Sequence, residues 1–373
     1  MPDDVQPALL ADSEELEPSD REELADPDPQ PEPVTYTGTD FDVEGLVRRL
    51  KRGDIVIPTF GETGASIETD RFQRRFVWGR SQMSRFIESL LLGYPIPGIF
   101  LVQQADRRYL VLDGQQRMRT LADFYSGTHK GKPFALEDVA DDLRGLTYEG
   151  LSLEQRRTLD NTFIPAIIVK TDGSPESLDA VYQVFERLNS GGTQLTPHEI
   201  RVALYAGPIM EFLAELNDCE TWRSLYGPES RRLRDQELVL RIIALHVSPG
   251  TYRRPLKRYL NDFAAQHRFL TDLPVDRLRN QFSSVAEVIQ NGPGPDALRY
   301  GSRQVNAALT EAIFVGMMRR LEAASPPNPS LISDVIGSMH EQPGFDLAIS
   351  RATADEESVR TRLFVATQAF AGI

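Results

Sequence analysis

The sequence is poor in the residues that build disulfide frameworks, membrane spans and secretion signals. Cys219 is the single cysteine in 373 residues, which excludes an internal disulfide and a cysteine-rich zinc site. No apolar run approaches the length of a membrane span, and the N-terminus lacks the basic flank and apolar core of a secretion signal. We therefore expect a cytoplasmic protein with no membrane partner.

Basic residues are nearly absent from the N-terminus, where negative charge is concentrated. The first 33 residues hold twelve Asp and Glu, one Arg and seven prolines, and they carry −11 of the formal net charge of −14. They contain no aromatic residue, so they have too little apolar surface to offset the entropy lost on ordering. Residues 1–37 are therefore predicted to be a disordered tail, and we interpret it as solubilising in preference to a regulatory or DNA-mimicking arm.

Strand and helix patterns alternate from residue 38 to residue 175. Helical spacing of apolar residues predicts helices at 43–50, 83–91 and 115–125. Apolar runs bounded by turn residues predict four strands, which are DIVIPTF (54–60), IFLVQQ (99–104), YLVLD (109–113) and FIPAIIVK (163–170). We expect an Ala-Asp-Arg-Arg turn to join the second strand to the third.

Beyond residue 175 the pattern is helical. Thr196, Pro197 and Glu199 supply the N-cap, the first-turn proline and the acid of a capping box. Further helical patterns lie near residues 177–189, 235–246, 256–267, 276–290, 303–322 and 356–370. The predicted fold class is a mixed α/β domain over residues 38–175 followed by an all-helical domain over residues 176–373.

The segment LVLDGQQRMRTL (110–121) ends a buried strand in a cluster of polar residues. Asp113 stands at the carboxyl end of that strand, where open α/β sheets place their ligands. Gly114 lets the backbone turn without a Cβ clash. Gln115, Gln116 and Arg117 then begin a helix, whose first amides have no acceptor within the helix and can bind an anion.

Two side chains at this corner suggest a ligand. Arg117 can hold a phosphate through two hydrogen bonds, and Asp113 can bind a divalent metal between phosphates or orient an attacking water. Phosphate with a metal is therefore the ligand that the corner favours. A second interpretation is that Asp113 caps the helix and Arg117 makes a surface ion pair. A P-loop is excluded because no Walker A sequence is present.

Two further motifs combine polar groups with strand or turn signals. RFQRRFVW (71–78) alternates aromatic residues with arginines, as a strand does, but this alternation does not explain Gln73 and Arg74 together, which could contact a phosphate or nucleobase. VFERLNSGGTQLTPHEIR (184–201) ends a helix at Asn189 and continues into two glycines. A glycine C-cap between two helices also explains this second motif.

The three motifs, in this order, resemble the N-terminal nucleotide-using domain of GmrSD-type restriction proteins, relatives of the ParB and sulfiredoxin fold. The similarity spans about residues 54–205 and implies a ParB/sulfiredoxin-like α/β domain. It implies a nucleoside triphosphate and Mg²⁺ as cofactors, with hydrolysis in several members. The residues that match the DGQQR signature are Asp113, Gly114, Gln115, Gln116 and Arg117.

The resemblance also assigns roles to individual residues. Asp113 and Arg117 are the expected catalytic pair, with Asp113 as metal ligand. Gln73 and Arg74 match the family's upstream QR element, and Asn189 matches the asparagine of its F-x-x-x-N element. Together with the signature residues, these three side chains are expected to bind the nucleotide.

The function implied by the resemblance is anti-phage restriction of modified DNA, gated by nucleotide turnover. Many relatives carry a C-terminal His-Asn-His nuclease domain, but the five histidines of this chain are scattered. We therefore expect a stand-alone form that works with a separate nuclease subunit. The alternative is a nucleotide-gated DNA- or protein-binding module that does not hydrolyse, as in ParB-like clamps. Cleavage of DNA by this chain itself is a weaker third reading, and homo-oligomerisation is left open.

A short basic stretch is a second candidate for contacts with DNA. TYRRPLKRYL (251–260) carries Arg253, Arg254, Lys257 and Arg258 beside two tyrosines. Such a patch would neutralise phosphates, and its binding would weaken with salt. SLYGPESRRLR (224–234) offers a similar cluster. Solvated helix faces explain both stretches equally well.

Overall fold

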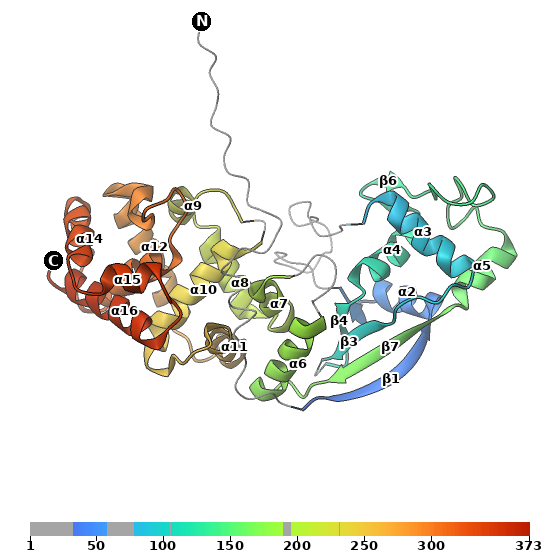
Figure 1. Cartoon of the computed structure of the whole chain (residues 1–373), viewed down its shortest axis with the longest axis horizontal. Coiled ribbons are helices and arrows are strands. Elements are labelled where there is room, and N and C mark those ends of the chain that lie inside the picture. The colour runs from blue at the N-terminus through green and yellow to red at the C-terminus, as the bar shows by residue number, and fades with distance from the viewer. Residues whose placement is uncertain (1–32, 58–77, 105, 189–194, 231) are drawn as a thin grey trace, which may run out of the picture. The chain divides into compact units, whose positions relative to one another are not determined.

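The computed structural model describes residues 33–57, 78–104, 106–188, 195–230 and 232–373 (Figure 1). They form two compact units, one within Gln30–Gln194 and the other within Leu195–Ile373. The first contains a mixed sheet with its helices and the second is helical, which confirms the predicted fold class. The division falls after residue 194, whereas the sequence pattern places the change at 175. Residues 1–32 of the predicted tail lie outside the described residues. The predicted end of the tail at residue 37 is wrong, because the strand β1 (Thr35–Asp42) already begins at Thr35 and pairs there with another strand.

A five-stranded sheet organises the first unit, in the order β1-β7-β3-β4-β2. β3 pairs antiparallel with β4 and parallel with β7, while β2 is parallel to β4 and β1 is antiparallel to β7. The predicted hairpin between β3 and β4 is thereby confirmed. The strands are β1 (Thr35–Asp42), β2 (Ile55–Val56), β3 (Ile99–Gln103), β4 (Tyr109–Asp113) and β7 (Phe163–Lys170). β5 (Thr128–His129) and β6 (Lys132–Pro133) form a separate small hairpin.

Four helices of this unit lie together on one side of the sheet (Figure 1). They are α2 (Val43–Lys51), α3 (Arg80–Leu91), α4 (Gln115–Ser126) and α5 (Leu153–Asp160), and α6 (Pro175–Leu188) follows β7. Their apolar faces and the inner side of the sheet share one core, in which Leu46, Ile87, Val111 and Leu121 are completely buried. Trp78 packs at its margin, edge-to-face against Phe86 with ring centroids 5.6 Å apart.

The second unit is built from helices of 6 to 17 residues. They are α7 (Pro197–Leu204), α8 (Pro208–Asn217), α9 (Glu220–Tyr226), α10 (Arg234–Val247), α11 (Leu256–Gln266), α12 (Val275–Asn291), α13 (Ala307–Ala323), α14 (Ile332–His340), α15 (Phe345–Ser350) and α16 (Glu356–Ala371). No helix among the described residues has the length and apolar composition that a bilayer crossing requires.

α13 runs through the centre of this helical unit, since every side chain from Ala308 to Met318 is buried. Gly316 lets α16 approach closely, because a Cβ at that position would lie 2.9 Å from the Ala366 carbonyl oxygen. Trp222 of α9 fills the neighbouring space, with its ring 5.5 Å from Phe282 and 5.3 Å from Phe314. Aromatic packing of this kind stabilises a core beyond simple burial.

Candidate functional site

The predicted corner is formed where β4 ends and α4 begins. Asp113 is the last residue of β4, and Gly114 turns the chain with φ of 94° as the N-cap of α4. An added Cβ on Gly114 would lie 2.6 Å from Cγ2 of Ile99 and 3.3 Å from a guanidinium nitrogen of Arg117. Glycine is therefore required here both for the backbone conformation and for the space.

Arg117 and Asp113 form the central contact of the corner. An N–H of Arg117 donates to Oδ2 of Asp113 over 2.7 Å, and a second N–H donates to the carbonyl oxygen of Pro97. The Arg117 side chain is 11% exposed, whereas that of Asp113 is 48% exposed. The carboxylate thus lies at the surface with a buried guanidinium behind it. The interpretation of Arg117 as a surface ion pair is wrong in one respect, because the arginine is buried.

Gln116 faces a different neighbour from Asp113. Its Oε1 accepts a hydrogen bond from the backbone N–H of Trp78 over 3.3 Å. Its own carbonyl oxygen accepts from Oγ1 of Thr120, one helical turn further on. The DGQQR signature therefore contacts the C-terminal end of RFQRRFVW, although 38 positions separate the two residues in the chain.

The first turn of α4 supplies the anion-binding element of the corner. Gly114 caps the helix without a side chain, while its carbonyl oxygen accepts from the Met118 N–H over 2.9 Å. In an α-helix the preceding amides, those of Gln115, Gln116 and Arg117, have no acceptor within the helix. Together with the helix dipole, these amides favour a phosphate at this end.

A metal at this corner would rest mainly on Asp113. Among the residues that the structure describes, no three His, Cys, Asp or Glu side chains converge in a way that could hold a metal ion. Mg²⁺ usually keeps several waters and uses one or two carboxylates together with substrate phosphates. The half-exposed Asp113 fits that pattern, and its second oxygen is held by Arg117.

Three predicted nucleotide-binding residues fall outside the described part of the chain. Gln73, Arg74 and Asn189 belong to the ranges 58–77 and 189–194. Their roles therefore remain predictions.

The structure separates the four residues of the predicted basic stretch by burial. Arg253 and Arg254 are exposed and Arg258 is half-buried, but Lys257 is only 3% exposed. Arg254 is paired with Asp355 over 2.8 Å. Of the four, Lys257 is therefore the least able to contact DNA phosphates.

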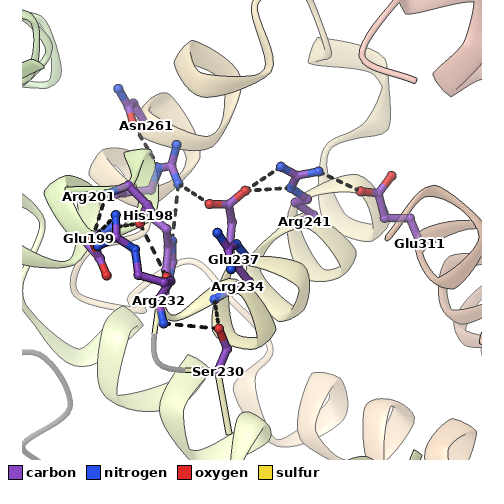
Figure 2. Close-up of polar contacts among 11 residues, drawn as sticks. His198, Glu199, Arg201, Ser230, Arg232, Arg234, Glu237, Arg241, Asn261 and Glu311 are labelled. Atoms are coloured by element: carbon purple, nitrogen blue, oxygen red, sulfur yellow. Dashed lines mark hydrogen bonds and ion pairs between the residues drawn. The ribbon is translucent and has the colours of Figure 1, made fainter. Parts of the chain in front are cut away.

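A buried polar network around α7 is the feature that sequence patterns did not reveal (Figure 2). The predicted capping box is confirmed, since Thr196 N–H donates to Glu199 over 2.7 Å and Glu199 N–H donates back over 3.2 Å. Arg201 donates to Asn261 of α11 over 2.9 Å and lies 3.8 Å from Glu237 of α10. His198 is completely buried, with Nδ1 3.3 Å from Arg201.

The network continues from α10 into the centre of the unit. Arg241 donates to Glu237 and lies 3.7 Å from Glu311 of α13, which also pairs with Arg362 of α16. Burial lowers the pKa of His198 to about 3, so its imidazole is neutral near pH 7. Arg241 holds the pKa of the Glu237 carboxyl below its usual range. The partners that lie on different helices are 36 to 70 residues apart in sequence, so only the polar positions of the PHEIR segment (197–201) could have indicated the network.

Residues 57–206 match the family model described as the GmrSD restriction endonuclease N-terminal domain. This segment of the chain is therefore similar to the GmrSD N-terminal family. This GmrSD segment includes the DGQQR corner, Trp78 and α7, and so it extends past the division between the two units at residue 194. A search of curated proteins returned no match. The ParB/sulfiredoxin-like fold and the stand-alone form remain predictions.

Proposed function

We propose that this protein binds a nucleoside triphosphate at the β4–α4 corner and uses its turnover in a restriction system. The carrying observation is that Asp113, Arg117 and a helix N-terminus meet at one corner within the GmrSD segment. The family match supports a role in restriction, with DNA as substrate and a nuclease as partner. Modified phage DNA and a separate nuclease subunit are the specific partners that we propose.

Each group at the corner would have a different role in binding the nucleotide. The amides at the start of α4 would bind phosphate oxygens, and Arg117 would add positive charge beside them. The exposed Asp113 would hold Mg²⁺, which neutralises charge on the phosphates. Because Asp113 and Arg117 are bonded to each other, each fixes the orientation of the other before the ligand arrives.

A second candidate is a nucleotide-gated binding module that does not hydrolyse its ligand. The observation in its favour is that one oxygen of Asp113 is already bonded to Arg117. Such a carboxylate is less available to orient an attacking water. In this case the bound nucleotide would act by stabilising one conformation, and the helical unit would bind DNA or a partner protein.

The test is phosphate release from each of the four ribonucleoside triphosphates with Mg²⁺, with and without duplex DNA. Wild type is compared with Arg117→Ala, and Arg119→Ala on the same helix is the matched control. We expect release that DNA increases, that Arg117→Ala removes and that Arg119→Ala retains. Thermal stabilisation by one nucleotide without phosphate release would support the binding module. Neither release nor stabilisation in wild type would contradict both functions.

A further inference from the structure

The end of α2 lies beside the start of β4 in the α/β unit. The backbone N–H of Tyr109 donates to the carbonyl oxygen of Asp54 over 2.8 Å, and Ile55 of β2 pairs with Tyr109. The guanidinium of Arg49 in α2 lies over the ring of Phe41, which packs edge-to-face against the ring of Tyr109. The last turn of α2 and the turn between β3 and β4 are therefore neighbours.

Positive charge predominates where these two turns meet. Residues 44–54 and 106–108 hold six Lys and Arg against three Asp and Glu, although the whole chain has a formal net charge of −14. Five of the six cations are exposed, and we call these five the basic edge. They are Arg48, Lys51 and Arg52 of the α2 end and Arg107 and Arg108 of the β3–β4 turn.

Two cations of the basic edge have carboxylate partners. Arg52 is paired with Asp54, and Arg108 is paired with Asp106 over 2.6 Å. The four side chains are 41% to 58% exposed, and ion pairs at such exposure add little stability. Glu44, one turn before the basic end of α2, is the third acid of these segments. The carboxylates therefore neutralise only part of the positive charge.

The other three cations of the basic edge are available to a ligand. No described residue forms an ion pair or hydrogen bond with the side chain of Arg48, Lys51 or Arg107. Arg48 and Lys51 lie one turn apart on α2, where basic residues also stabilise the negative end of the helix dipole. The helix dipole explains these two residues but not Arg107, which lies in the β3–β4 turn.

Arg107 has a backbone conformation that favours glycine. Its φ is 68°, and its N–H donates to the carbonyl oxygen of Gln104 over 2.9 Å. Hairpin turns usually place glycine in this left-handed conformation, because a Cβ is strained there. Strained residues of this kind are most common at functional sites. Arginine at this position places a positive charge on the turn although glycine would fit the backbone better.

We propose that the basic edge binds the phosphate backbone of duplex DNA. Exposed and unneutralised Lys and Arg side chains from two neighbouring elements are the groups that attract this backbone. The surface belongs to the α/β unit and is distinct from the predicted basic stretch at 253–258 in the helical unit. The inference goes beyond the proposed function, because DNA binding at the basic edge requires neither nucleotide binding nor turnover.

The basic edge and the nucleotide corner lie at opposite ends of β4. Tyr109 begins this strand and Asp113 ends it. Four steps of a strand span about 14 Å, at about 3.4 Å per residue. DNA on the basic edge therefore does not need the groups that the nucleotide would use. The two ligands can be tested separately.

The experiment measures the affinity of the full chain for a short fluorescent duplex at several salt concentrations, without nucleotide. The triple variant combines Arg48→Ala, Lys51→Ala and Arg107→Gly. Loss of each phosphate contact should reduce the slope of log affinity against log salt by about 0.9, so the triple variant should lose about 2.7. Arg107→Gly alone should lose about 0.9 while its thermal unfolding midpoint is unchanged or higher, because glycine adopts this φ without strain.

Lys130→Gly is the matched control for Arg107→Gly. Lys130 is also an exposed cation with a positive φ, of 49°, and it lies in the turn between β5 and β6. β6 lies beside α3 and is well separated from β3 and β4 (Figure 1). The control therefore removes one charge from a similar turn elsewhere on the same unit, and we expect its salt slope to equal that of wild type.

Four results would overturn the basic edge as a DNA surface. They are a wild type that binds no duplex, an unchanged slope in the folded triple variant, an equal loss of slope in Lys130→Gly, and binding to phosphatidylserine vesicles in place of duplex DNA. The proposed function is tested apart from this, since phosphate release without DNA should be the same in the triple variant and in wild type. A wild type without nucleotide binding would contradict the proposed function and leave the DNA measurement valid.

Discussion

Arg362 of α16 donates to Glu311 of α13, and both side chains are almost completely buried. Arg362 also donates to the carbonyl oxygen of Thr353 over 2.5 Å, and Glu311 lies beside Arg241 of α10. The pair therefore joins three helices at the centre of the helical unit. Burial makes such a pair sensitive to the loss of either partner, because the remaining charge has no solvent to stabilise it.

Replacement of Glu311 by Gln should strongly destabilise the helical unit. The change removes the charge that neutralises Arg362, and such losses cost about 3 to 5 kcal/mol. The expected effect is a fall in the unfolding midpoint of about 10 °C, measured by thermal unfolding. The double variant Glu311→Leu with Arg362→Met, which removes both charges, should recover most of the loss. A double variant as unstable as the single one would contradict this account.

The helical unit should become less stable as the pH is lowered, because of His198. Its pKa is lowered by burial to about 3 from an ordinary value of 6.5, so the unfolded chain binds the proton first as pH decreases. Stability is therefore fully present above pH 6.5 and is lost below it, by up to about 1.4 kcal/mol per pH unit for this group.

His198→Asn tests this pH dependence, because asparagine retains an acceptor for Arg201 but does not titrate. Urea unfolding between pH 6.5 and 5 should show a shallower loss of stability in the variant than in wild type. His246 and His267, whose pKa values are also lowered by burial, contribute equally to both proteins. Equal slopes in the two proteins would rule out a neutral buried His198.

Gly114→Ala should harm the α/β unit more than the same change at Gly127. Both glycines have positive φ, 94° and 75°, but only Gly114 faces Ile99 at short distance, while nothing lies near Gly127. We expect a loss of about 3 kcal/mol for Gly114→Ala and about 1 kcal/mol for Gly127→Ala. Urea unfolding gives both values, and equal losses would mean that Ile99 moves aside without penalty.

Asp113→Asn should remove the negative charge of the corner while keeping its hydrogen-bonded geometry. The amide oxygen can still accept from Arg117, so the fold and the position of Arg117 should persist. If Asp113 holds Mg²⁺, phosphate release should fall at least about 100-fold. Circular dichroism verifies the fold, and a Mg²⁺ titration shows whether higher metal concentrations restore turnover. Full activity in this variant would remove Asp113 from the catalytic pair.

Within the basic stretch, the exposed arginines and the buried lysine should behave differently toward DNA. Arg253→Ala should reduce the slope of log affinity against log salt by about one if it contacts a phosphate. Lys257→Ala should instead lower stability and leave the slope unchanged, because Lys257 is buried. Duplex DNA binding measured at several salt concentrations distinguishes the two. An unchanged slope for Arg253→Ala would exclude this stretch from DNA contact.

Local signals explain which elements could be predicted from sequence. The apolar run before Asp113, the turn at Gly114 and the capping box at Thr196 are each encoded within a few residues, and all three occur as predicted. β1 gave no such signal, because its first six residues are exposed and its backbone pairing is with β7. Its existence depends on a partner more than 100 residues away.

The same distinction applies to the site. The sequence positions of Asp113 and Arg117, at the end of a strand and the start of a helix, predicted that the two residues share a corner. They did not predict that Arg117 is buried and donates to the carbonyl oxygen of Pro97. Lys257 was assigned to a basic surface because charge patterns do not show which side of a helix faces the core. The burial of Arg201 could not be predicted either, because its buried charge is compensated by Asn261 and Glu237, which lie on other helices.

The two tryptophans of the chain are divided between the two units. Trp78 lies at the half-buried margin of the α/β core, whereas Trp222 is fully buried among Phe282 and Phe314 and donates to Asn217. Replacing one of them by phenylalanine leaves an intrinsic fluorophore in the other unit alone. Tryptophan fluorescence can thus follow the unfolding of each unit separately, without any attached label.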